Sequence, residues 1–146
     1  MNVIETVKKI LTDCELMDEF NQIHVDYTET EESPLSAGLF ANGAVKTGED
    51  IIGNPKYRMP FTLYTGLQSV NDYDRLKNSD FLLRLTYYMN GQKDIPITEN
   101  LNGTDYNGII TDISGSNALL FDYPTGTPDL VRYQLQIQVN YRIEIE

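Results

Sequence analysis

His24 and Cys14 have the clearest potential for nucleophilic or metal chemistry, because the chain has one histidine and one cysteine. A thiol nucleophile needs a base beside it, and a zinc site needs three or four His, Cys or acidic ligands. Cys14 falls on the apolar stripe of a helical pattern, whereas His24 takes a polar position in a strand pattern. We therefore expect a core cysteine and a surface histidine, with no metal site.

A phosphate-binding loop is suggested by the spacing of Gly38 and Gly43, with Lys46 close behind. Such a loop requires the lysine directly after the second glycine, because its ammonium group must reach the phosphates that the backbone amides hold. Two residues intervene here, and no helical pattern follows to supply an N-terminal dipole. We expect a turn-rich β segment and no nucleotide cofactor.

Carboxylates are plentiful, so residue types alone leave open a glycosidase-like acid/base pair. The spacing of Asp105, Asp112, Asp122 and Asp129 lacks the tight alternation of a calcium loop. Most of these residues are expected in turns or on solvated faces. No catalytic residue and no cofactor is predicted, and an enzyme with a carboxylate site stays as an alternative.

The net charge of −11 and the pI near 4.4 limit the partners of the chain. Nucleic-acid binding requires Lys and Arg to neutralise phosphates, so neither nucleic acid nor an anionic membrane is an expected partner. A single cysteine favours a reducing compartment. The first residues lack a secretory signal, and no apolar run approaches a membrane span, so we expect a protein made in a cytoplasm.

The first half of the chain predicts one helix followed by β structure. Apolar residues at helical spacing indicate a helix over 3–17, with Asn2 and Glu5 as a capping box. A short strand is predicted over 23–27. The polar segment 28–34 reads as a loop, irregular short strands are expected over 39–57, and a firmer strand over 58–65.

The second half predicts another helix and three strands. Ser79 can cap a helix that ends at Asn90-Gly91 in a left-handed cap. Asp94-Ile95-Pro96 reads as a sharp exit from it. Two β runs, 108–114 and 118–123, are predicted to form a hairpin through 115–117, and 125–128 turns the chain into the last strand. We expect one domain over 1–146.

The last sixteen residues alternate between apolar and polar types without an error, which predicts one strand with a dry face and a wet face. Such length exceeds the usual five or six residues, so part of the strand was a candidate for an intersubunit sheet or contact edge. The predicted fold is α+β: a largely antiparallel or mixed sheet, two main helices packed on one face, and a long C-terminal strand.

The order of these elements resembles the small tail-terminator proteins, also called tail completion or minor capsid proteins, of phages and prophages of Gram-positive bacteria. An amphipathic N-terminal helix leads into an extended segment. The resemblance then runs through a basic-aromatic strand (56–63), a helix (78–88), the exit 94–97 and the closing strand 132–141. It covers most of the chain from about Leu39 onward. The chain has tyrosine at Tyr87 or Tyr88 where relatives often have tryptophan.

The resemblance implies a structural virion protein without enzymatic activity. Its relatives form a homo-oligomeric ring, usually six-fold, that caps the head-proximal end of the tail tube and mediates head-tail joining. The implied partners are other copies of the chain, the tail tube protein and the head connector protein. Another neck or connector protein, or a small acidic binding module, stays as an alternative. The candidate assembly or lumen-facing residues are Glu29, Glu31, Glu32, Arg132, Gln134, Gln136, Gln138, Asn140 and Arg142.

Overall fold

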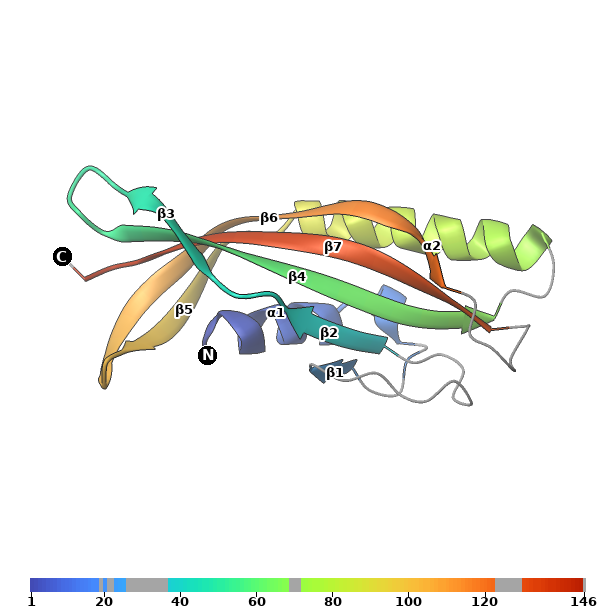
Figure 1. Ribbon diagram of the computed structural model, residues 1–146, viewed down its shortest axis with the longest axis horizontal. Coiled ribbons are helices and arrows are strands. Elements are labelled where there is room, and N and C mark those ends of the chain that lie inside the picture. Colours follow the sequence, from blue (N-terminus) through green and yellow to red (C-terminus); the bar gives the residue numbers. More distant parts are fainter. Residues whose placement is uncertain (19, 21–22, 26–36, 69–71, 123–129, 146) are drawn as a thin grey trace.

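The computed structural model describes residues 1–18, 20, 23–25, 37–68, 72–122 and 130–145 (Figure 1). These residues form two α-helices, one short 3₁₀ helix and seven strands. In chain order the elements are α1 (Val3–Thr12), η1 (Glu15–Met17), β1 (Ile23–Val25), β2 (Ala37–Ala41), β3 (Val45–Glu49), β4 (Pro55–Gln68), α2 (Asp72–Asn90), β5 (Lys93–Leu101), β6 (Thr104–Asp122) and β7 (Leu130–Ile143).

The strands form one mixed sheet in the order β1-β2-β4-β7-β6-β5, and β3 pairs with the first part of β4. β1 and β2 are parallel, whereas the other neighbours are antiparallel. The long strands β4, β6 and β7 run side by side and twist along the length of the molecule (Figure 1). The predicted α+β class with a largely antiparallel or mixed sheet is confirmed.

Both helices pack on the same face of the sheet, as predicted, and they share one hydrophobic core with it. α1 contributes Val7 and Leu11, and α2 contributes Leu82, Leu85 and Met89, all of them buried. The largest fully buried side chains of the sheet are Phe61, Leu39, Leu63, Ile110, Leu135 and Ile137. Neither of the described helices covers the opposite face of the sheet.

α1 begins where the sequence predicts and ends earlier. The Asn2 side chain accepts a hydrogen bond from Glu5 N at 2.9 Å, and Glu5 Oε1 accepts one from Asn2 N at 3.3 Å, which completes the capping box. The helix stops at Thr12 because Cys14 takes an extended conformation, with ψ at 124°. The apolar spacing continues to Met17, but it does so through η1.

α2 begins at Asp72, so the predicted start at Ser79 is wrong. The acidic residue Asp74 suits the first turn of a helix, where the helix dipole favours negative charge. The predicted end at Asn90 is confirmed. The predicted left-handed cap is wrong, because Gly91 N closes the last turn by donating to Tyr88 O at 3.2 Å, and the positive φ falls instead at Asp94 (56°).

β6 is one strand of 19 residues, so the predicted hairpin over 115–117 is wrong. Gly115 and Ser116 pair with Ile137 and Gln136 of β7, and shifts in register further along the strand absorb the irregular spacing. The tight turn lies earlier, between β5 and β6, at Asn102-Gly103 (φ 54° and 90°), a pair typical of two-residue hairpin loops. Asp94-Ile95-Pro96 lies inside β5 rather than at a loop exit.

The remaining predictions for the sheet are confirmed where the structure describes the residues. β1 matches the short strand expected from Ile23, β2 and β3 are the expected short strands, and β4 extends the strand predicted over 58–65 in both directions. Tyr27, the loop 28–34 and the turn 125–128 lie outside the described residues.

β7 is the predicted long C-terminal strand, and it lies in the middle of the sheet. It pairs with β4 from Lys56↔Arg142 to Gln68↔Leu130, and with β6 on its other side. Both backbone edges of β7 are thus used within the chain. The hypothesis that part of this strand completes an intersubunit sheet is wrong for β7, because β4, with 14 residues, and β6, with 19, pair with it on its two sides.

Candidate assembly surface

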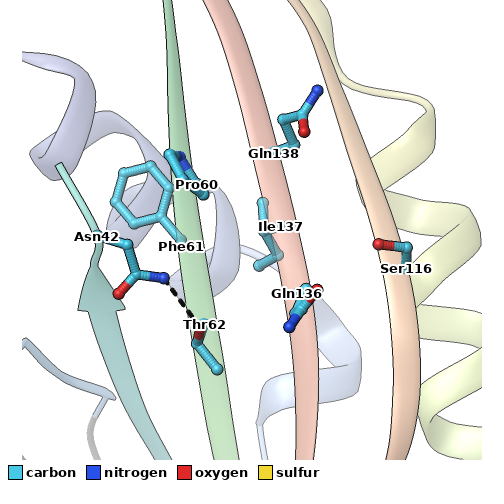
Figure 2. A pocket seen from close by; sticks show the side chains of 8 residues that line it. All are labelled: Asn42, Pro60, Phe61, Thr62, Ser116, Gln136, Ile137 and Gln138. Carbon is cyan, nitrogen blue, oxygen red and sulfur yellow. Dashed lines mark hydrogen bonds between the residues drawn. The ribbon is translucent and has the colours of Figure 1, made fainter. Parts of the chain in front are cut away.

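The polar residues of β7 form one continuous row on the uncovered face of the sheet. The alternating apolar residues from Val131 to Ile143 are buried, whereas the residues between them are partly or fully exposed. In Figure 2 the Gln136 and Gln138 side chains point away from the helices, and Ile137 points toward them. The predicted residues that this row brings together are Arg132, Gln134, Gln136, Gln138, Asn140 and Arg142. Glu29, Glu31 and Glu32 lie outside the described residues.

Neighbouring strands widen this row into what we call the polar platform: the β7 row with Lys56, Arg58 and Thr62 of β4 and Asp112 and Ser116 of β6. Register places these residues directly opposite the row, for example Thr62 beside Gln136 and Asp112 beside Asn140. Side chains opposite each other on one face of a sheet lie about 4.5–5.5 Å apart at Cβ, so the platform is a contiguous surface.

The centre of the platform is a shallow neutral hollow of about 160 Å³. Asn42 Nδ2 donates to Thr62 Oγ1 at 3.0 Å on one side of it, and Ser116 lies on the other (Figure 2). The amides of Gln136 and Gln138 complete the polar lining. Amides and hydroxyls can donate and accept hydrogen bonds, but none of them supplies a general base at neutral pH.

One end of the platform is basic although the chain is strongly acidic. Lys56, Arg58 and Arg142 line a hollow of about 410 Å³ there, together with Asp112 and Asn140. Asn140 Nδ2 donates to Asp112 Oδ1 at 2.7 Å, and an Arg142 Nη lies 3.7 Å from a carboxylate oxygen of Glu144. Three cations and one carboxylate line the hollow, so the charge of its lining is positive. This end can therefore accept an acidic group from another molecule.

The two strands that end the main strand order, β5 and β1, offer little backbone for a partner strand. β5 carries a positive-φ residue at Asp94 and a proline at Pro96, and Thr98 N donates to Met1 O at 2.9 Å. Bulges, prolines and covering segments are the devices by which proteins protect a sheet edge. β1, at the other edge, has three residues. β3 differs from them, because it pairs with β4 alone among the described strands and all five of its residues are exposed.

Cys14 and His24 lie in the core and on β1, respectively. Cys14 is 2% exposed, and burial raises the pKa of its thiol, so it stays protonated in the core as predicted. His24 is half-buried on β1. No group of three or more His, Cys, Asp or Glu side chains that could hold a metal occurs among the described residues. No helix in the same part of the chain is long and apolar enough to cross a membrane.

The sequence matches no protein-family model and no curated protein.

Two features of the surface were missed from the sequence. Lys56 and Arg58 join Arg142 only through the register of β4 and β7, which no local pattern specifies. The exposed pair Ile51-Ile52 lies in the segment 39–57, for which the sequence predicts irregular short strands, so its exposure was not predicted. The two adjacent isoleucines in a glycine-rich segment are the sequence feature that could have indicated this exposed apolar pair.

Two stacked tyrosines support the basic end from the core side. The rings of Tyr57 and Tyr141 lie 5.4 Å apart at 18°, and the two residues are directly opposite in the register of β4 and β7. Burial raises the pKa of Tyr141 to about 12, and the nearby carboxylate of Glu99 adds to the shift. The neutral hydroxyl is thus favoured in the folded state.

This raised pKa predicts a loss of stability in alkali. The unfolded chain releases the Tyr141 proton near pH 10, whereas the folded state keeps it to about pH 12. The stabilisation is therefore complete below pH 10 and is lost as the pH rises toward 12. We expect Tyr141→Phe to unfold in urea with a shallower loss of stability between pH 9.5 and 11.5 than the wild type.

The matched control is Tyr87→Phe, because Tyr87 is 64% exposed on α2. It reports any general effect of removing one tyrosine hydroxyl. If Tyr141→Phe follows the same pH dependence as the wild type and this control, the role of Tyr141 burial in the alkaline limb is contradicted.

Proposed function

We propose that this chain is a structural phage tail protein: a tail terminator that assembles into a ring on the head-proximal end of the tail tube and mediates head-tail joining. Its partners are further copies of itself, the tail tube protein and the head connector protein, and its place is the virion tail. Its work is done by interfaces, without a catalytic step or a cofactor. The resemblance in element order supports this proposal.

The observation that carries the proposal is the two-faced sheet. A 14-residue central strand, β7, buries every apolar residue between Val131 and Ile143 on the helix side and presents a polar row on the other. The row is uncovered, mostly neutral, and continued on both neighbouring strands. Non-obligate interfaces are about as polar as the rest of a protein surface, so such a platform suits contact between separately folded subunits.

Charge favours protein rather than DNA as the occupant of the platform. Lys56, Arg58, Arg132 and Arg142 lie on or beside the row, and these cations would hold phosphates if the platform lined the DNA passage. The net charge of −11 means that the remaining surface is strongly acidic. We infer that the platform contacts a subunit or the tube, while acidic surface faces the DNA and repels it.

The proposal is tested by deleting the gene from the phage or inducible prophage that encodes it and measuring tail lengths by negative-stain electron microscopy. Tails of abnormal, widely distributed length without joined heads are expected, because an uncapped tube keeps growing. Complementation with the wild-type gene is the control and should restore one length.

Two other outcomes separate the alternatives. Tails of normal length that fail to join heads would assign the protein to the neck or connector. Fully normal virions would discard the structural role and return attention to a small acidic binding module or an enzyme with a carboxylate site.

A further inference from the structure

The hairpin between β3 and β4 ends in an apolar tip at Ile51 and Ile52. Ile51 is fully exposed and Ile52 is 65% exposed, although isoleucine is among the residues most often buried. The tip projects at one end of the long axis, beyond the start of β4 (Figure 1). Two adjacent branched side chains in this position offer an anchor for a binding partner.

Hydrogen bonds hold this tip in one conformation. The Asp50 carboxylate accepts from Ile52 N at 3.1 Å, from Asn54 N at 2.9 Å and from Asn54 Nδ2 at 3.1 Å. Asn54 is 4% exposed, and its Oδ1 accepts from Ile145 N at 2.9 Å, which ties the loop to the end of the chain. Gly53, at φ 94°, allows the tight turn. A loop ordered in advance loses little entropy when it binds.

An apolar groove lies toward the other end of the molecule, between η1, the end of β4 and α2. Its apolar lining is formed by Leu16, Phe20, Leu67 and Phe81, and its volume is about 280 Å³. The rings of Phe20 and Phe81 lie 5.9 Å apart in its wall. An apolar cavity of about 150 Å³ holds benzene, so this groove has room for the eight side-chain carbons of two isoleucines.

We propose that Ile51 and Ile52 of one copy of this chain insert into the groove between η1 and α2 of a second copy. The tip cannot reach the groove of its own chain, because Pro55 and Leu67 lie near opposite ends of β4, a strand of 14 residues that spans roughly 45 Å. A contact between two different patches is heterologous, and repeated contacts of this kind close into a ring when the rotation allows it.

Size and position together favour a second copy as the occupant. The tip and the groove match in volume and lie at opposite ends, as a head-to-tail contact requires. The rim of the groove carries charges of both signs, Lys77 and Arg84 beside Glu15 and Asp80, and Arg84 Nε pairs with Asp80 Oδ2 at 3.0 Å. At the tip, Glu49 pairs with Lys46 at 3.1 Å, so the contact is expected to depend on the apolar side chains rather than on charge. This inference rests on the proposed ring, and it assigns the subunit contact.

The contact is tested with two variants of the full chain and their mixture, by sedimentation velocity over a range of concentrations. The tip variant, Ile51→Asp with Ile52→Asp, loses the anchor. The groove variant, Asp80→Trp, places a bulky ring over the groove from a position that is 55% exposed, so the fold should persist. Circular dichroism and thermal unfolding confirm folding of both.

The wild type should form species larger than a dimer, and each variant alone should be monomeric, with self-association weakened on the order of a hundredfold or more. Their equimolar mixture should give dimers and nothing larger, because one intact tip meets one intact groove. The control Leu76→Asp changes an apolar side chain that is 71% exposed on α2 and is not part of the groove lining, and it should assemble as the wild type does.

A wild type that stays monomeric, a tip variant that assembles normally, or a mixture that does not form dimers would overturn this contact. If Asp80→Trp assembles normally while the tip variant does not, the tip binds elsewhere and the groove is rejected as its site. None of these results touches the tail-length test. Conversely, normal tails after gene deletion would remove the terminator function and leave a measured contact in place.

Discussion

Truncation of Phe61 to alanine should lower the free energy of unfolding by about 3–5 kcal/mol, the range for deleting a large aromatic side chain from a core. Phe61 is fully buried at the middle of β4, opposite Ala41 of β2 and Ile137 of β7. At Phe61, β4 is paired with β2 on one side and with β7 on the other. The cavity left by the substitution therefore cannot be filled by a shift of an edge strand. Urea unfolding followed by circular dichroism measures the loss.

The matched control is Thr62→Ala, one residue further along the same strand. Thr62 points to the polar platform, and its Oγ1 accepts a hydrogen bond from Asn42 Nδ2 at 3.0 Å on the exposed side. Removing that bond should cost roughly 0.5–1.5 kcal/mol or less. Equal losses for the two variants would contradict the register of β4, because a shift by one residue exchanges the two faces of a strand.

The sequence predicted the parts of this fold that depend on local period. The alternation from Val131 onward indicates a two-faced strand, and the same pattern identifies the platform residues of β7 without reference to their neighbours. The start of α1 was equally local, because the Asn2 and Glu5 capping box is complete within four residues. Such features need no knowledge of distant contacts.

The errors arose where distant pairing overrides local preference. Gly115-Ser116 reads as a turn, yet both residues lie in a continuous strand because Ile137 and Gln136 of β7 pair with them. The length of β7 suggested a partner subunit, but the chain itself supplies two neighbours that are at least as long. Pairing partners are set by the whole sheet, so neither outcome could be read from a window of ten residues.

The sequence predicted one part of the polar platform and missed another. One strand supplies the polar row, which period alone revealed. The basic end requires Lys56 and Arg58 to meet Arg142, and that meeting is fixed by the antiparallel register of β4 and β7. The acidic loop around Glu31 stays a prediction for the DNA-facing surface, because it lies outside the described residues.

Substitution of Gly108 by alanine should also destabilise the fold, by about 1–3 kcal/mol, as overpacking typically does. A Cβ at Gly108 would lie 2.7 Å from the carbonyl oxygen of Arg142 and 3.1 Å from Ile97 Cγ1. The first of these atoms is backbone of the neighbouring strand and cannot rotate away. β6 and β7 must therefore separate where Arg142 joins the platform.

Gly115→Ala is the control within the same strand, because its Cβ would come no closer than 3.4 Å to Thr86 Cγ2, an ordinary van der Waals distance. We expect a change within roughly 0.5–1 kcal/mol, since alanine also loses less backbone entropy than glycine on folding. Thermal and urea unfolding of both variants decide the question, and a loss at Gly115 as large as that at Gly108 would contradict the close approach of the strands.

Because Gly108 lies beside the end of β7, its substitution should also displace Arg142 and weaken the binding of any acidic partner at the basic end of the platform. A stability loss accompanied by unchanged binding of such a partner would show that the basic end does not depend on this packing.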